Sequence, residues 1–299
     1  MCMGVADNGM IVGHAPIADN VTIHAFAWTR DTLMVDIGTL TDLGHRGYHF
    51  SLAYGTNKSG TLIVGWSATG YGTADSLPVV WTPRSVWQRG SWSTVWQIQK
   101  LETAGFKGST KWTAEFATDF GQIIGSANDS NGMPFGVVWN PMPNGDWKIS
   151  RLPGFSADFP GVAPSDINNL GQIVGDVVAA DGSTSFPALW TPKPWGKGYV
   201  VTMLPTLAGY QQIYGDGEGI NDRGDIVGGS YDVNGNYLVT LWRWKDSQYV
   251  PIALPTPSGN FNLYYSWATK INNEGVITGS YAADTVPENT VAWKLYESH

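Results

Sequence analysis

The chain has 299 residues, a formal net charge of −8 and 42% hydrophobic residues. Charged residues make up only 14% of it, against roughly 25% in an ordinary soluble domain. This balance argues against nucleic-acid binding, because affinity for phosphates depends on Lys and Arg. The single cysteine, Cys2, excludes internal disulfides and a Cys-based metal site. No run approaches the ~20 apolar residues of a membrane helix, so we expect no membrane insertion.

In chain order, the first pattern is Gly9-Met-Ile-Val-Gly13, which is followed by Trp28. Both markers occur six times, at steps of 50 to 60 residues. Two markers with one period near fifty predict a repeat fold such as a solenoid or a propeller. The closing glycines are Gly13, Gly65, Gly125, Gly175, Gly228 and Gly279, and the tryptophans are Trp28, Trp81, Trp139, Trp190, Trp242 and Trp293.

The fourth copy shows what one repeat contains. Asn168-Asn-Leu-Gly171 is typical of a tight turn closed by a left-handed glycine. A β-rich segment follows at 172–178, and Gly175 within it indicates a bulge or a close backbone approach. Further strands are expected at 186–190 and 199–204. Four short antiparallel strands at this period predict a propeller blade, whereas a right-handed β-helix, the alternative, typically has shorter turns.

Six such copies predict one all-β domain over residues 1–299, a six-bladed β-propeller of four-stranded antiparallel blades. The last blade is expected to be incomplete, because only six residues follow Trp293. The first five blades have predicted fourth strands at 33–40, 94–101, 148–152, 199–204 and 249–254.

The third strand of the first copy reads His24-Ala25-Phe26-Ala-Trp28. With the repeated Asn-x-x-Gly-x-Ile-Val-Gly and Ala-x-x-Trp phrases, it resembles the HAF-repeat family of bacterial exported proteins, over nearly the whole chain. The resemblance implies a propeller and an extracellular or periplasmic location, although the first residues lack a signal-peptide pattern. It supplies no catalytic motif.

Residues that break the repeat are better site candidates than its framework, because function concentrates in loops on a rigid scaffold. Loops from each outer strand to the next inner strand carry aromatic, amide and carboxylate side chains, at 44–50, 106–116, 155–159, 210–218 and 260–267. We expect these loops to lie on the face that holds the central pocket of the propeller. Their composition predicts binding of a glycan or a small neutral polar ligand there, or else aromatics that plug the channel mouth. The ligand-binding candidates are His45, Arg46, Tyr48, Trp112, Asp158, Phe159, Tyr210, Gln212, Tyr214, Tyr264, Tyr265 and Trp267.

An enzyme acting on polysaccharide is the alternative. A glycosidase needs two carboxylates roughly 5 to 10 Å apart, and a lyase needs a base such as His49 or Tyr48 beside a cation such as Arg46. The sialidase pattern Ser-x-Asp-x-Gly-x-Thr-Trp is absent from the sequence. The catalytic candidates are Glu115, Asp216, Glu218 and His49, with Asp158 as a further carboxylate.

No cofactor and no metal site are expected. Asp129-Ser-Asn-Gly132 and Asp232-Val-Asn-Gly-Asn236 resemble parts of a calcium loop but lack its closing Glu, and both patterns are also ordinary hairpin turns. The second repeat is lengthened around Arg84–Trp92, which indicates a protruding hairpin or a long turn packed on the blade edge. An exposed hairpin would favour a third function, a scaffold for protein interactions. We expect a monomer.

Overall fold

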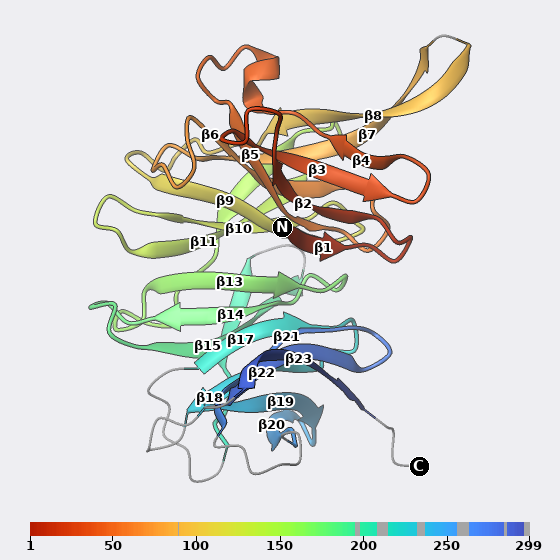
Figure 1. The fold of residues 1–299 in the computed structure, drawn as a ribbon. Helices are drawn as coiled ribbons and strands as arrows, with labels where there is room; N and C mark the ends of the chain where they lie inside the picture. The colour runs from red at the N-terminus through yellow and green to blue at the C-terminus, as the bar shows by residue number, and fades with distance from the viewer. Residues whose placement is uncertain are drawn as a thin grey trace. The chain divides into compact units, whose positions relative to one another are not determined.

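The residues that the structure describes fold as six successive antiparallel β-sheets, five of four strands and a last one of three. The computed structural model describes residues 1–88, 90–194, 198–207, 215–231, 237–255, 263–283 and 286–295. The all-β class, the six propeller blades and the incomplete last blade are therefore confirmed (Figure 1). No helix in these residues is long and apolar enough to cross a membrane.

The first of two compact units, Met1–Leu152, contains three blades. Blade one consists of β1 (Cys2–Val5), β2 (Ile11–Pro16), β3 (Ile23–Thr29) and β4 (Leu33–Asp36), and the 3₁₀ helix η1 (Leu40–Leu43) follows it. Blade two consists of β5 (Phe50–Thr56), β6 (Ile63–Ala68), β7 (Leu77–Gln88) and β8 (Ser91–Lys100). Blade three consists of β9 (Thr110–Ala117), β10 (Ile123–Asn128), β11 (Pro134–Pro141) and β12 (Trp147–Arg151).

The second unit, Pro153–His299, contains the other three blades. Blade four consists of β13 (Gly161–Ile167), β14 (Ile173–Val178), β15 (Ser185–Pro192) and β16 (Tyr199–Met203). Blade five consists of β17 (Gly215–Ile220), β18 (Ile226–Tyr231), β19 (Tyr237–Lys245) and β20 (Gln248–Ala253). Blade six consists of β21 (Leu263–Ile271), β22 (Val276–Ala283) and β23 (Val286–Lys294). That all six blades form one domain stays a prediction.

The turn between the first two strands of a blade has the predicted chemistry. In blade four, Gly171 has a φ of +75°, which an L side chain rarely adopts. The buried Asn168 side chain accepts hydrogen bonds from the backbone N–H groups of Leu170 (3.1 Å) and Gln172 (3.0 Å). Its amide donates to the carbonyl of Asn221 in blade five (2.9 Å). One asparagine therefore closes its own turn and ties two neighbouring blades.

The glycine that closes the repeated phrase lies where two backbones come close. A Cβ atom at Gly175 would be 2.7 Å from the Cα of Pro164 on β13, nearer than real contacts allow. The ladder between β13 and β14 is irregular between Pro164 and Asp166. The predicted bulge and close approach are thus both present, and glycine is needed because it has no side chain.

Five of the six repeated tryptophans are buried, as expected for framework residues, and Trp28 is half-buried. Trp139, Trp190 and Trp242 are fully buried in the blade cores. Their indole N–H groups donate to carbonyl oxygens 37 residues earlier, those of Glu102, Pro153 and Pro205. Each acceptor comes directly after the buried leucine that follows the preceding fourth strand. These bonds satisfy a buried donor and position the link into each blade.

Candidate functional site

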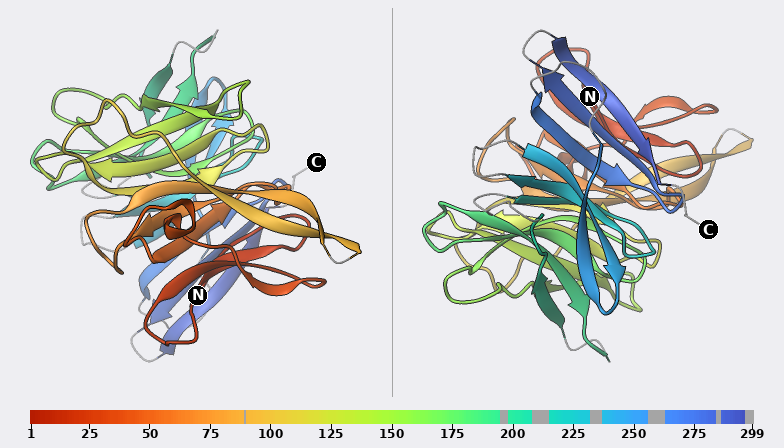
Figure 2. Two further views of the ribbon diagram at one scale, coloured as in Figure 1. Left: turned by 90° about the horizontal axis from the view of Figure 1, so that it is seen from above. Right: turned by 90° about the horizontal axis from the view of Figure 1, so that it is seen from below.

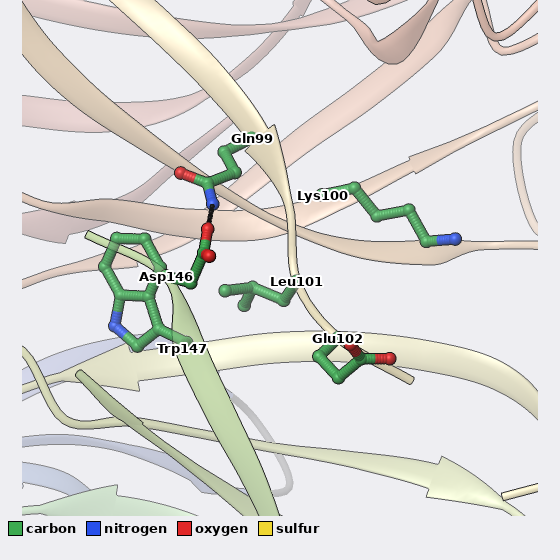
Figure 3. Close-up of a pocket in the computed structure, with 6 residues that line it drawn as sticks. All are labelled: Gln99, Lys100, Leu101, Glu102, Asp146 and Trp147. Atoms are coloured by element: carbon green, nitrogen blue, oxygen red, sulfur yellow. Dashed lines mark hydrogen bonds between the residues drawn. The ribbon is translucent and has the colours of Figure 1, made fainter. Parts of the chain in front are cut away.

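A pocket of about 350 Å³ lies in the first unit, where the outer strand of blade two meets the outer strand of blade three. Strand β8 and the residues after it supply one wall, and the turn before β12 supplies the other (Figure 3). The lining residues are Gln99, Lys100, Leu101, Glu102, Asp146 and Trp147.

The β11–β12 turn presents Asp146 to the pocket. The N–H of Met142 donates to the carbonyl of Asp146 (2.7 Å), and Gly145 has a φ of +87° that suits a tight turn. Asn144 donates to the Asp146 Oδ2 atom (2.7 Å). Gln99 of blade two donates to the Oδ1 atom of Asp146 in blade three (3.2 Å). Both carboxylate oxygens therefore have a donor, and Gln99 joins the two blades at this point (Figure 3).

Trp147 is the aromatic side chain of the pocket. It is half-buried, packs against the core cluster of blade three, and donates its indole N–H to the carbonyl of Gly121 (2.8 Å). A ring held at its polar end and packed along part of its surface has little rotamer freedom left to lose on binding. It can therefore offer its exposed part to a ligand at small entropic cost.

The rest of the pocket combines an apolar base with charged edges. Leu101 is almost completely buried, at 1% exposed, within a hydrophobic cluster, and its N–H donates to the Pro78 carbonyl (2.9 Å) at the end of the blade-two ladder. Glu102 accepts the N–H of Ala104 with its Oε1 atom (2.7 Å). In Figure 3 the amine of Lys100 points away from the Gln99–Asp146 pair. The described residues hold no group of three or more His, Cys, Asp or Glu side chains that could bind a metal.

The predicted residues after η1 lie in an exposed loop. The rings of His45 and Tyr48 contact edge to face with centroids 6.2 Å apart. Burial raises the pKa of the Tyr48 phenol, and the Asp75 carboxylate raises it further. The Nδ1 atom of His49 lies 3.5 Å from the Thr41 hydroxyl. His45, Arg46 and His49 are exposed, whereas Tyr48 packs partly on the core of blades one and two.

Trp112 and Glu115 lie on the inner strand β9 and not in a loop. Trp112 is 3% exposed and packs in the core of blade three, with its ring 5.5 Å from that of Phe135. Glu115 is half-buried and its Oε1 atom accepts two hydroxyl hydrogen bonds of 2.7 Å, from Thr113 and Ser126. As placed, Trp112 stabilises the blade, and Glu115 is a hydrogen-bonded carboxylate on the innermost strand.

The other candidates belong to the second unit. Asp158 is exposed, and its carbonyl accepts the N–H of Ala180 (2.9 Å). Phe159 packs edge to face on Phe186, with 5.2 Å between ring centroids. Glu218 lies half-buried on β17. Asp216 lies on β17, and Tyr264, Tyr265 and Trp267 lie on β21, in stretches whose side chains fall outside the description; Tyr210, Gln212 and Tyr214 lie outside the described residues altogether.

The sequence did not single out the pocket. Gln99 and Asp146 are 47 residues apart and meet only because neighbouring blades pack side by side. Trp147 stands outside the repeated tryptophans, and that was the one signal that pointed to this position.

Comparison with known proteins finds similar structures but no similar sequence. No family model matches the chain, and no curated protein matches it. A sialidase of Trypanosoma rangeli in complex with a 2,3-difluoro-KDN ligand is similar over 97% of this chain and 52% of that one, at 13% identity and a TM-score of 0.51. The same enzyme with 2,3-difluorosialic acid, a covalent intermediate, has the same values.

A third structure, AofleA from Arthrobotrys oligospora, covers 98% of this chain and 81% of its own at 13% identity, with a TM-score of 0.49. The chain spans about half the length of the sialidase chains that it matches. Identities this low show a common fold only. By its structure, then, the chain is similar to the β-propeller of a sialidase.

Proposed function

We propose that the protein binds a carbohydrate, or a similar polar ligand rich in hydroxyl groups, and that the pocket between β8 and β12 takes one of its rings. The observation that carries this proposal is the pairing of an immobilised indole, Trp147, with the Gln99–Asp146 hydrogen bond in one hollow. Sugar rings present apolar C–H faces and polar hydroxyl edges. An aromatic surface beside amide and carboxylate groups is complementary to both.

The dimensions agree with this ligand class. The pocket volume of about 350 Å³ lies at the lower end of the roughly 300–1,000 Å³ found for small-molecule sites. Gln99 keeps its Oε1 atom as an acceptor while its amide N–H binds Asp146. Hydroxyl groups can donate to the Gln99 and Asp146 oxygens, and each such bond contributes about 0.5–1.5 kcal/mol.

The fold adds support of a weaker kind. The similar sialidase of T. rangeli has been solved with 2,3-difluorosialic acid, so a propeller of this kind can hold a sugar derivative. Other residues that the sequence indicated, such as Glu115 on β9 and His49 in the loop after η1, stay predictions for a second part of the site. Cleavage of the bound glycan is the enzymatic alternative.

The test is a binding screen of the full chain against a panel of oligosaccharides, with newly released reducing ends followed in parallel. We expect binding without cleavage, and a roughly tenfold loss of affinity in both Gln99→Ala and Trp147→Ala, equal to about 1.4 kcal/mol. Trp147→Ala also removes core packing, so Gln99→Ala, at a half-buried position, is the decisive variant.

Trp244→Ala is the matched control, because Trp244 is 58% exposed on blade five and lies far from β8 in sequence. Equal affinity of wild type and Gln99→Ala for every bound sugar would refute the pocket assignment. Release of new chain ends would replace simple binding with the enzymatic alternative, and Glu115→Gln would then be the first variant to assay.

A further inference from the structure

The hairpin formed by β7 and β8 is the feature that the proposed pocket leaves unexplained. In blade four, the ladder of the last two strands continues only from Trp190↔Val201 to Pro192↔Tyr199. In blade two, the corresponding ladder continues from Trp81↔Ile98 to Gln88↔Ser91. Figures 1 and 2 show this yellow-orange hairpin extending beyond the other strands of its blade. The predicted protruding hairpin is therefore present.

Two tryptophans occupy the end of the hairpin. Trp87 and Trp92 are directly opposite each other in the ladder, and their rings contact edge to face with centroids 5.5 Å apart. Trp87 is 60% exposed and Trp92 is 70% exposed. Large aromatic side chains that gather at an exposed site without packing in a core indicate a binding surface.

The same face of the hairpin carries hydroxyl groups. Because side chains alternate along a strand, the next pair on the Trp87–Trp92 face is Ser85↔Thr94, and the pair after it is Pro83↔Trp96. Ser85 and Thr94 are exposed. The face therefore presents two aromatic rings and, one step closer to the blade, two hydroxyls.

The charge of this region is opposite to that of the chain. No Asp or Glu occurs from Ser76 to Leu101, whereas Arg84, Arg89 and Lys100 do, in a chain of net charge −8. Arg84 is exposed and lies opposite Val95, on the other face from the tryptophans. Its guanidinium thus attracts an anionic ligand by long-range electrostatics more than by contact with rings stacked on Trp87 and Trp92.

We propose that the hairpin is an arm that holds an acidic polysaccharide, whose rings stack on Trp87 and Trp92 and whose carboxylate or sulfate groups are attracted by the basic side chains. This inference rests on the proposed function, since β8 also leads into the pocket at Gln99. Gln99 is seven positions after Trp92 along β8, about 23 Å at roughly 3.3 Å per residue, and the odd spacing places it on the opposite face of the strand. Only a chain of several sugar rings reaches both places.

The hydroxyl pair beside the rings favours a polysaccharide over an anionic membrane or a protein. A membrane contact would use the tip alone. A glycan would also use the Ser85–Thr94 pair, one step closer to the blade. The two partners are therefore distinguishable by where substitutions act.

The experiment measures binding of the full chain to polygalacturonate, to a neutral glucan of similar length, and to vesicles containing phosphatidylserine. We expect tight, salt-sensitive binding to polygalacturonate, weaker binding to the glucan, and none to vesicles. Trp87→Ala with Trp92→Ala should weaken polygalacturonate binding roughly tenfold or more, and Arg84→Gln should mainly reduce its salt sensitivity.

Trp244→Ala and Arg30→Gln are the matched controls, because both residues are exposed on other blades, and both should bind like wild type. The proposal is overturned if the double variant keeps full affinity for polygalacturonate, or if vesicles bind and polygalacturonate does not. If Gln99→Ala still weakens binding of short neutral oligosaccharides in that case, only the proposal for the arm is rejected. If they do not, the proposed function falls as well.

Discussion

Blades two and four are built on the same plan but differ where each blade is entered and where it ends. Trp81 and Trp190 are both fully buried, yet only Trp190 has a partner for its indole N–H, the Pro153 carbonyl at 2.8 Å. The Trp81 N–H has no partner among the described residues. The corresponding acceptor, the Thr41 carbonyl, lies in η1 and accepts the N–H of Gly44 instead (2.9 Å).

The difference teaches that two blades with the same buried tryptophan can still differ in their entry and in their outer hairpin. Blade two loses a framework hydrogen bond and gains a longer outer hairpin with exposed tryptophans. Blade four keeps the bond and ends at a short fourth strand. Variation is thus concentrated in the outer parts of blade two, where the pocket and the arm are formed.

The largest expected effect concerns Gly65, the glycine that closes the repeated phrase in blade two. A Cβ atom at Gly65 would overlap the Leu52 carbonyl oxygen and lie 3.1 Å from the Cα of Ala53, both backbone atoms. We expect Gly65→Ala to lower the free energy of unfolding by about 3 kcal/mol or more. Urea titration followed by Trp fluorescence measures it.

Gly70→Ala in the same blade is the control, because its Cβ would meet only the Cγ2 atom of Thr73, at 3.1 Å. That variant should change stability by less than about 1 kcal/mol. Similar losses for Gly65→Ala and Gly70→Ala would contradict the close-approach explanation.

The missing hydrogen bond of blade two gives the next effect. Trp190→Phe leaves the Pro153 carbonyl without its donor, whereas Trp81→Phe removes a buried N–H that has no described partner. Both variants lose similar ring volume, so Trp190→Phe should cost about 1–3 kcal/mol more than Trp81→Phe. Thermal and urea unfolding of the two variants measure the difference, and a larger loss for Trp81→Phe would refute the comparison.

Blade four should also show a dependence on alkaline pH. Burial raises the pKa of Tyr199, at the start of β16, to about 12. The unfolded chain loses this proton near the ordinary Tyr value of about 10, so the folded state binds more protons between these values. The stabilisation is complete below pH 10 and is lost as pH rises towards 12.

The measurement is the urea midpoint at several pH values in this window, for wild type and Tyr199→Phe. The variant cannot ionise at this position, so its stability should fall less steeply with pH. Parallel curves for the two proteins would show that Tyr199 keeps an ordinary pKa.

The smallest expected effect on stability concerns the arm. Trp87 and Trp92 are exposed and belong to no buried cluster, so replacing both with Ala should change the free energy of unfolding by about 0.5 kcal/mol or less. The same substitutions are expected to weaken polysaccharide binding. A large loss of stability would mean that the Trp87–Trp92 pair supports the fold of blade two. The outer hairpin would then contribute to stability as the inner strands do.

Much of the fold could be predicted because its determinants are local and repeated. Asn168 and Gly171 mark a turn, and Gly175 and Trp190 mark the second and third strands, in the same order in each repeat. The shortened end after Trp293 likewise predicted a three-stranded blade. The resemblance to HAF-repeat proteins stays a prediction.

The site was less predictable. The sequence predicts Trp112 as a loop aromatic, but β9 begins at Thr110 and its alternation turns Trp112 inward to Phe135. No sequence pattern marks Gln99 or Asp146 as a site residue. An amide on one strand and a carboxylate in a distant turn are common, and only the packing of the two blades brings them together. Exposure of the Arg84–Trp92 hairpin was one of two alternatives that only packing could separate.

The sequence by itself determined the blade count, the turns and the framework tryptophans, since backbone geometry and burial of each repeat depend on residues close together in the chain. Only the tertiary structure decided which divergent residues share a surface. Contacts such as Gln99–Asp146 depend on how one blade packs against the next, and no spacing within a single repeat encodes that arrangement.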